Sequence, residues 1–136
     1  MNTEPAYSLR PIGHIRRSGT ETRVDLFPKY SDGLLGIEGF SHIIVCYWLH
    51  ENDNQEGRST LRVHPRGDAT NPLTGVFATH SPRRPNPIAI SICALERVAD
   101  STLYIDEIDA FDGSPVLDIK CFIPLDDRHA RVPDWV

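Results

Sequence analysis

A proline-rich loop between two apolar runs places the strongest constraint on how this chain can fold. Three prolines fall within six positions of the stretch 75–91, and they are Pro82, Pro85 and Pro87. Each proline fixes its own φ angle and pushes the preceding residue toward extended geometry. Residues 79–87, here called the signature loop, are therefore expected to be stiff and non-helical. A short buried strand is predicted before the loop at 76–78, and another strand begins after it at Ile88.

The polar side chains of the signature loop have two explanations. The loop carries two adjacent arginines together with asparagine, histidine, serine and threonine. A rigid loop with these groups suits a preorganised polar site. A proline-rich surface turn with solvated arginines accounts for the same composition equally well.

The rest of the chain reads as short strands separated by Gly, Pro, Asn and Asp turn signals. The further strands are predicted at 9–15, 22–27, 41–49, 60–64, 88–95, 102–108 and 116–123. One helical turn is expected within 28–35. No dinucleotide-binding glycine fingerprint, Walker loop or strand–helix alternation is present, which argues against a Rossmann fold. We predict an all-β chain, a small closed or partly open β-barrel of about seven strands with short helical turns.

Three of these strands carry specific burial predictions. The run 41–49 is apolar without alternation, so it is expected to be buried on both faces. In the strand 60–64, Leu61 and Val63 are expected to face inward. In the strand 88–95, three isoleucines alternate against Ala89, Ser91 and Cys93.

Length, charge and cysteines narrow the class of protein. The 136 residues are expected to form one domain (1–136), with its core at about 9–124 and a tail at 125–136 that the pattern does not place. No apolar run reaches membrane-spanning length, and the first residues lack a secretory pattern. Cys46, Cys93 and Cys121 lie in apolar runs, which is typical of reduced core cysteines in a cytoplasmic protein.

Neither metal binding nor broad nucleic-acid binding is predicted by composition. The six histidines show no metal-ligand spacing, so no metal site is expected. A net charge of −5 argues against tight nonspecific binding to nucleic acid. The arginines in the middle of the chain are nevertheless compatible with one local basic face.

Four blocks of sequence resemble the TsaA/TrmO family. Residues 78–89 are similar to its signature Ala-Thr-Arg-Ser-Pro-x-Arg-Pro-Asn-Pro-Ile-Gly, and 36–50, 108–120 and 11–16 resemble other family blocks. The resemblance extends from about Leu9 to Pro124. It implies a small β-barrel that forms a homodimer and uses S-adenosylmethionine. It also implies methylation of the N6 nitrogen of threonylcarbamoyladenosine beside the tRNA anticodon.

The resemblance also implies a site for the methyl donor that is shared among three parts of the chain. The residues expected to bind S-adenosylmethionine are His50, Glu51, Thr79, His80, Ile88, Asp109, Ala110, Phe111, Asp112 and Gly113. A sulfonium cation favours nearby carboxylates and aromatic faces. Asp109 and Asp112 could divide two tasks, one accepting a hydrogen bond from the donor and the other receiving the N6 proton. A turn that holds Gly113 explains Asp112 as well.

The signature loop is expected to contact the acceptor. Arg83, Arg84 and Asn86 are the predicted substrate-binding residues, because a guanidinium group binds phosphate or carboxylate bidentately. Arg84 matches the family arginine, position 83 is variable in the family, and Asn86 could instead satisfy the loop backbone.

Asp112, His80 and Arg84 are the residues predicted to take part in the reaction. His80 stands where the family usually has arginine, and Ala89 replaces the usual glycine. A histidine titrates near neutrality, so it could act as a base or as a weaker anion contact. Because of this departure, the resemblance leaves open whether this chain shares the family's specificity for tRNA.

Three hypotheses about function follow. The first is a methyltransferase that uses S-adenosylmethionine and acts on adenosine in tRNA. The second keeps this donor with a small-molecule acceptor; the acidic net charge and His80 favour it slightly, while the motif match favours the first. The third is a non-catalytic barrel that binds RNA or a nucleotide.

Overall fold

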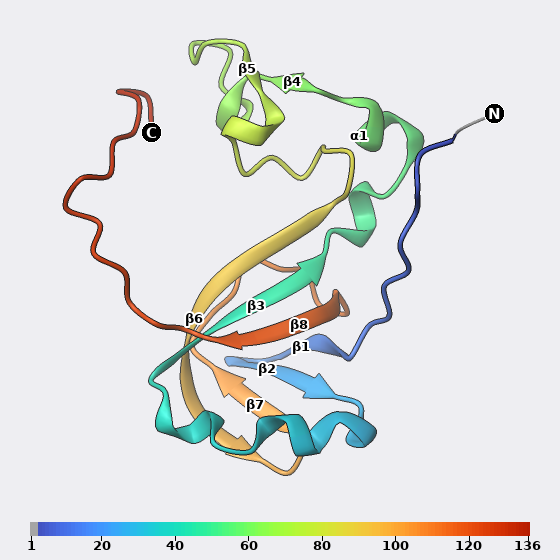
Figure 1. Ribbon diagram of the computed structural model, residues 1–136, viewed down its shortest axis with the longest axis vertical. Coiled ribbons are helices and arrows are strands. Elements are labelled where there is room, and N and C mark those ends of the chain that lie inside the picture. Colours follow the sequence, from blue (N-terminus) through green and yellow to red (C-terminus); the bar gives the residue numbers. More distant parts are fainter. Residues whose placement is uncertain (1–2) are drawn as a thin grey trace.

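Six antiparallel strands close into a barrel in the order β1-β2-β7-β6-β3-β8 (Figure 1). A computed structural model describes residues 3–136, so the first two residues of the predicted domain 1–136 lie outside the described residues. The strands are β1 (Gly13–Ser18), β2 (Glu21–Leu26), β3 (His42–Trp48), β6 (Ile88–Ala99), β7 (Thr102–Ile105) and β8 (Pro115–Cys121). The barrel closes where Gly13 pairs with Val116. The predicted all-β barrel is confirmed, with six strands in the barrel itself.

A small lobe stands on one end of the barrel, at the top of Figure 1. Residues 50–87 form it between the neighbouring strands β3 and β6. The lobe holds η3 (His50–Asn52), α1 (Gln55–Ser59), β4 (Arg62–Val63), η4 (Pro65–Gly67), β5 (Thr74–Gly75) and η5 (Val76–Ala78). Its base is closed by a hydrogen bond of 2.7 Å from the Leu49 amide to the Pro87 carbonyl. Pro87 is fully buried there, so the signature loop ends at a fixed point.

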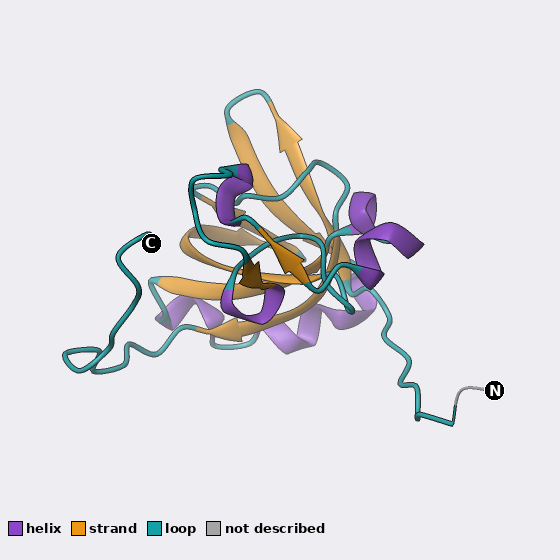
Figure 2. Ribbon diagram, turned by 90° about the horizontal axis from the view of Figure 1, so that it is seen from above, coloured by secondary structure: helices purple, strands orange, loops and turns teal. Residues whose placement is uncertain are grey.

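The opposite end of the barrel is covered by two short 3-10 helices, at the bottom of Figure 1. They are η1 (Pro28–Leu34) and η2 (Ile37–Gly39), and η1 confirms the helical turn predicted within 28–35. Among residues 3–136, the structure contains no helix with the length and apolar character that crossing a membrane requires. The N-terminal and C-terminal segments run along opposite sides of the molecule (Figure 2).

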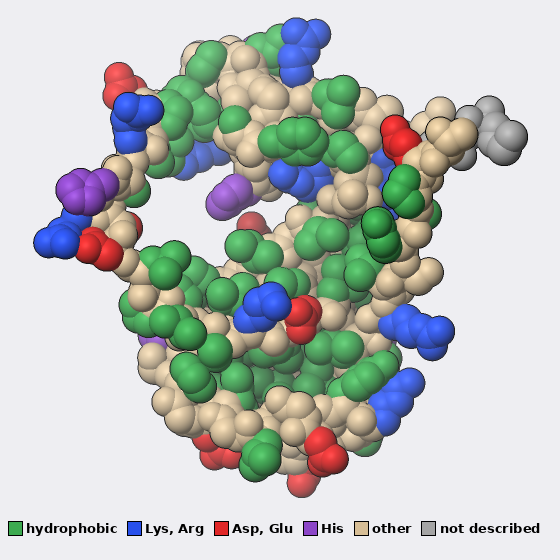
Figure 3. Space-filling view, viewed as in Figure 1, with side chains coloured by type: hydrophobic (Ala, Val, Ile, Leu, Met, Phe, Trp, Pro, Cys, Tyr) green, Lys and Arg blue, Asp and Glu red, His purple; other side chains and the backbone are tan. Residues whose placement is uncertain are grey.

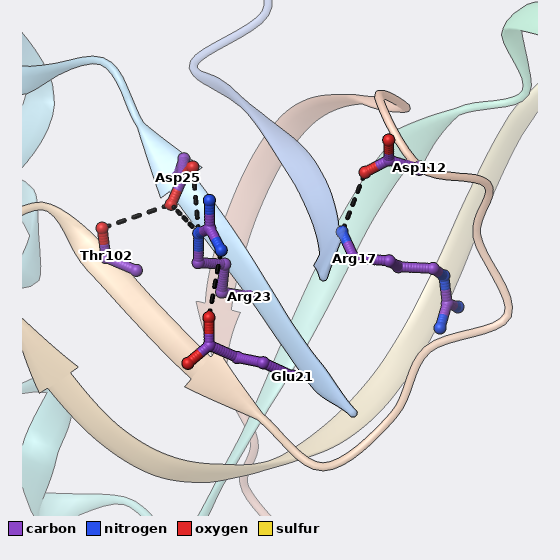
Figure 4. Close-up of polar contacts among 6 residues, drawn as sticks. All are labelled: Arg17, Glu21, Arg23, Asp25, Thr102 and Asp112. Carbon is purple, nitrogen blue, oxygen red and sulfur yellow. Dashed lines mark hydrogen bonds and ion pairs between the residues drawn. The ribbon is translucent and has the colours of Figure 1, made fainter. Parts of the chain in front are cut away.

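The core lies inside the barrel because each strand alternates between an inner and an outer face. β2 shows this directly: Val24 and Leu26 are buried, while Arg23 lies outside. The outer face carries a polar ladder in which Arg23 pairs with Asp25 and with Glu21, each at 3.0 Å (Figure 4). The buried residues of this hydrophobic core are Ile15, Val24, Leu26, Ile43, Val45, Tyr47, Cys93, Leu103, Ile105, Ile108, Ala110 and Val116.

The predicted burial of β3 on both faces is wrong. Its inner residues are buried, but Ile44, Cys46 and Trp48 on the other face are only half-buried. The physical reason is closure of the sheet, since a barrel strand has one face in the core and one face outside. The alternation predicted for β6 is present, and its isoleucines are the outward set: Ile90 and Ile92 are 64% and 56% exposed.

Two predictions for the lobe are also wrong. Residues Val76–Ala78 form a 3-10 helix rather than a strand, with Val76 buried and Phe77 79% exposed. Val63 in β4 is half-buried, but Leu61, which precedes β4, is 58% exposed rather than inward. The lobe contains only a two-stranded sheet, so it has no second layer against which these side chains could be buried.

The first strand begins later than predicted, at Gly13 instead of residue 9. Gly13 is required by close packing, because a Cβ atom there would lie 2.2 Å from the Asp25 carbonyl oxygen. β7 and β8 likewise end before their predicted limits of 108 and 123.

Candidate functional site

A pocket of about 330 Å³ opens between the end of β3 and the segment that precedes β8. This first pocket is lined by Arg17, Tyr47, Leu49, His50, Glu51, Asn52, Asp109, Ala110, Phe111, Asp112 and Ser114. Two of the three parts of the chain predicted to share a site therefore meet here. They lie more than fifty residues apart in sequence and come together because β3 and β8 are neighbours in the barrel.

Arg17, at the end of β1, holds the 108–112 segment in place. Its Nε donates to the Ala110 carbonyl at 2.8 Å, and its Nη2 donates to the Ile108 carbonyl. Its main-chain amide donates to Oδ1 of Asp112 at 2.8 Å (Figure 4). One residue thus binds three points of the 108–112 segment, two of which line the first pocket. Sequence reasoning missed Arg17, because its partners lie 91 to 95 residues away and no local pattern connects them.

Tyr47 supports the same wall from inside the barrel. Its hydroxyl donates to the Asp109 carbonyl at 2.8 Å and lies 3.3 Å from the Ser91 hydroxyl. Burial raises the pKa of Tyr47, the negative charge of Asp109 adds to the rise, and the Ser91 contact opposes it. The phenol therefore stays protonated at neutral pH and remains a donor. Tyr47 was predicted only as part of an apolar strand, and that pattern carries no signal for this role.

The turn after Phe111 completes the wall. Gly113 has a φ angle of 84°, a left-handed conformation that favours glycine, and its amide donates to the Ile15 carbonyl at 2.7 Å. The Ser114 hydroxyl donates to the Phe111 carbonyl at 2.7 Å. Asp112 accepts its hydrogen bond from the main-chain amide of Arg17 on β1, and not from an amide of this turn. Asp112 therefore connects the turn before β8 to β1.

The chemistry of the first pocket suits a cationic ligand with a polar body. The Glu51, Asp109 and Asp112 side chains bring three carboxylates to it, while the Arg17 guanidinium is occupied by backbone carbonyls. Phe111 adds an aromatic ring that is 63% exposed. Carboxylates and an aromatic face are the groups that attract a sulfonium cation, so the residues present fit S-adenosylmethionine.

The third part of the predicted site lies elsewhere. Thr79, His80 and Arg83 line a second, larger pocket of about 770 Å³, formed with the lobe and the C-terminal tail. Ile88 begins β6 and pairs with Trp48, outside the lining of the first pocket. The structure therefore brings together only the His50–Glu51 and 109–112 parts of the predicted site.

Arg84 and Arg83 have different surroundings. The Arg84 Nη1 donates to the carbonyls of Thr79 and Ser81, at 3.2 and 2.9 Å, and so braces the signature loop. Arg83 is exposed and pairs with Glu56 at 3.1 Å. Asn86 is exposed. Contact of these three side chains with an acceptor remains a prediction.

A family model described as the N-terminal domain of tRNA-methyltransferase O matches residues 9–128. The chain belongs to this family. The predicted family is confirmed, and with it the methyltransferase class and the use of S-adenosylmethionine at the level of the family. The position of the first pocket, between two of the blocks that carry the family resemblance, agrees with this assignment.

Relatives of this tRNA-methyltransferase O family member come from archaea, a bacterium and the mouse. A protein of Methanocaldococcus jannaschii named a probable S-adenosyl-L-methionine-binding protein is 44% identical over 116 residues, which are 85% of this chain and 92% of that protein. A mouse protein named tRNA (adenine(37)-N6)-methyltransferase is 36% identical over 107 residues, covering 79% of this chain and 24% of the mouse protein.

Solved structures agree with the family and the fold. The crystal structure of TrmO from Pseudomonas aeruginosa matches with a TM-score of 0.70 and 28% identity, covering 97% of this chain and 63% of that chain. The chain therefore spans a little less than two thirds of the length of that solved structure.

Proposed function

We propose that this protein transfers a methyl group from S-adenosylmethionine to the N6 nitrogen of threonylcarbamoyladenosine in tRNA. The observation that carries the proposal is the first pocket, where His50 and Glu51 meet the 109–112 segment inside a family domain that spans residues 9–128. The name of the mouse relative, a tRNA (adenine(37)-N6)-methyltransferase, supports tRNA as the acceptor.

The residues of the first pocket would hold and orient the donor. When bound, S-adenosylmethionine supplies an electrophilic methyl group on a sulfonium cation. The Glu51 and Asp109 carboxylates attract that positive charge, and the exposed ring of Phe111 offers it an aromatic face. Arg17 and Tyr47 keep the 108–112 segment fixed, which matters because positioning supplies most of the catalysis in a displacement of this kind.

Asp112 is our candidate for accepting the proton that the N6 nitrogen loses. Its Oδ1 accepts the Arg17 amide, so the carboxylate is held in one orientation and its second oxygen is left for the proton. His80 lies in the second pocket, and Arg84 braces the signature loop beside it. We propose that both act on the acceptor side.

Methylation assays on purified tRNA test the proposal. The protein is incubated with S-adenosylmethionine labelled in its methyl group and with tRNA that carries or lacks the threonylcarbamoyl group. We expect label only in the tRNA that carries the group, and at its N6 nitrogen. Equal labelling of both tRNAs contradicts the proposed acceptor. Tight binding of S-adenosylmethionine without labelling of either tRNA favours the small-molecule acceptor, whereas binding of RNA without any response to S-adenosylmethionine favours the non-catalytic barrel.

The outer face of β6 supports the predicted homodimer. Ile90 and Ile92 are exposed, and they pair with Cys46 and Ile44 of β3, which are half-buried on the same outer face. Exposed contiguous apolar surface of this kind marks interaction sites. We propose that two copies pack through it.

The cytoplasm is the proposed compartment. All three cysteines are free, which suits a reducing environment.

A further inference from the structure

The second pocket lies between the lobe, the signature loop and the C-terminal tail, and the proposed methyl-transfer chemistry leaves most of its residues unused. Its volume is about 770 Å³, which is in the size range of sites for organic ligands. Its walls come from residues 63–67, from 78–83 and from the tail residues Val132, Pro133, Trp135 and Val136. Figure 3 shows the hollow, framed by the lobe above and the tail on the left.

The walls of the second pocket are basic. Four basic side chains line it, from Arg66, Arg83, His64 and His80, and no Asp or Glu side chain is among the lining residues. Arg83 is paired with Glu56, but Arg66 has no ion pair among residues 3–136. Arg66 is therefore a cation of the lining without an ion-pair partner in the described part of the chain, and the chain as a whole carries −5.

Arg66 is presented by a turn that is held in an uncommon conformation. Its φ and ψ angles are 60° and 19°, in the left-handed region that non-glycine residues rarely adopt. Backbone of this kind clusters at ligand-binding sites, where the surrounding structure enforces it. Here Asn71 enforces it, because its side chain donates to the Pro65 carbonyl at 2.9 Å.

His64 is fixed by the same residue. Its Nδ1 lies 2.9 Å from the Asn71 carbonyl oxygen. A carbonyl oxygen only accepts, so Nδ1 carries the proton and Nε2 is left to face a ligand.

The tail supplies the apolar wall. Trp135 is half-buried, and Val132 and Pro133 line the pocket beside it. An indole ring and an arginine without an ion pair in one pocket are a combination that binds single-stranded nucleic acid, since bases stack on the ring while phosphates pair with the cation.

We infer that the second pocket binds a single-stranded nucleotide of the RNA acceptor, with its base against Trp135 and its phosphate at Arg66 and His80. This inference rests on the proposed function and adds an RNA contact outside the first pocket. The signature loop connects the two pockets. Its first residues line the second pocket. The carbonyl of its last residue, Pro87, accepts a hydrogen bond from the amide of Leu49, which lines the first pocket. RNA held by the second pocket would thus lie along the loop that leads to the donor.

Fluorescence of Trp135 tests the inference directly. The chain has two tryptophans, so a Trp48→Phe protein reports Trp135 alone. This protein is titrated with a single-stranded RNA of about seven nucleotides, within the usual span of such sites, and with tRNA that carries the threonylcarbamoyl group. We expect saturable quenching that weakens with salt.

The matching variants are made in the natural background. Trp135→Ala should weaken RNA binding about tenfold, and Trp135→Phe should retain most of the affinity. Arg66→Ala should weaken it about fivefold and lower the salt dependence. Affinity for S-adenosylmethionine should stay unchanged in all three. Arg10→Ala is the control, because it removes an equal charge from an exposed residue that does not line the pocket.

The outcomes separate this inference from the proposed function. If the protein methylates tRNA while Trp135 fluorescence does not respond, or while Arg66→Ala binds RNA like Arg10→Ala, the inference is overturned and the function stands. If the protein binds S-adenosylmethionine but neither the short RNA nor the tRNA, the inference and the proposed function are both overturned. Arg66→Ala decides the matter even if Trp135→Ala fails to fold, since Arg66 lies on an exposed turn.

Discussion

The main-chain amide of Arg17 donates to Oδ1 of Asp112 at 2.8 Å, across a separation of 95 residues in sequence. The Arg17 guanidinium donates hydrogen bonds to two carbonyls of the same segment, those of Ala110 and Ile108. The shape of the first pocket is therefore set from β1, by a residue that lies far in sequence from the segment it holds.

Replacement of Arg17 should loosen the first pocket. In Arg17→Ala the two carbonyls lose their charged donor, and each hydrogen bond of this kind contributes about 1.5–3 kcal/mol. We expect a lower melting temperature and weaker binding of S-adenosylmethionine, measured by thermal unfolding and calorimetric titration. Arg17→Lys keeps the charge but lacks the planar guanidinium that donates to both carbonyls, so it should recover little of the affinity for S-adenosylmethionine. Full affinity in Arg17→Ala would exclude a positioning role.

Removal of the Asp112 charge should affect the rate more than binding. Asp112→Asn keeps an oxygen that can accept the Arg17 amide but cannot take a proton. We expect the single-turnover rate of methylation to fall about a hundredfold, as for loss of a general base. Affinity for S-adenosylmethionine and the melting temperature should change little. Asp109→Asn is the comparison, because it should weaken S-adenosylmethionine binding instead; identical profiles for both variants would contradict the division of roles.

Arg84 should matter for the signature loop and for the acceptor, but not for the donor. Arg84→Ala removes the donor to the Thr79 and Ser81 carbonyls. We expect a lower melting temperature and weaker tRNA binding, with S-adenosylmethionine binding within about twofold of the original, because the first pocket lies elsewhere. Arg83→Ala serves as control: its exposed pair with Glu56 contributes about 0–1 kcal/mol, so stability should hardly change. The separation of the two pockets would be disproved by a matching loss of donor affinity in Arg84→Ala.

The exposed isoleucines of β6 should carry the dimer. Ile90→Asp places a charge in the middle of the proposed interface, where its burial would be costly. We expect light scattering to show a dimer for the natural protein and a monomer for this variant, with the barrel still folded by circular dichroism. Leu125→Asp is the control, an exposed apolar residue on the tail. A natural protein that is monomeric at working concentration refutes the dimer.

Cys93 should resist thiol reagents while the protein is folded. Burial raises the pKa of its thiol to about 11, from an ordinary value of 9.0, and nearby Asp106 and Glu107 add to the rise. The folded state therefore keeps the proton, so the contribution to stability is full below pH 9.0 and is lost as the pH rises toward 11. At pH 8 we expect Cys46 and Cys121 to react first, because both are only half-buried. Mass spectrometry after alkylation, with and without denaturant, identifies the order.

Local patterns in the sequence by themselves determined the class of fold and the family. Alternation in 22–27 and in 88–95 predicts strands because neighbouring side chains of a strand point to opposite faces. The blocks at 36–50 and 108–120 also predicted two walls of the first pocket before any geometry was known. The strand predictions succeed because alternation depends on residues that lie close together in sequence, whereas the expectation that the two blocks share a site came from the family resemblance.

Only the tertiary structure decided which face of each strand is inside and which distant residues meet. Period-two alternation is the same whether the isoleucines of β6 face the core or the solvent, and closure of the barrel turned them outward. The role of Arg17 depends on partners more than ninety residues away. Likewise, packing of the lobe and the tail brought Thr79 and His80 together with Arg66 and Trp135 in the lining of the second pocket, and not of the first. Such long-range contacts are products of packing, and no local stretch of sequence specifies them.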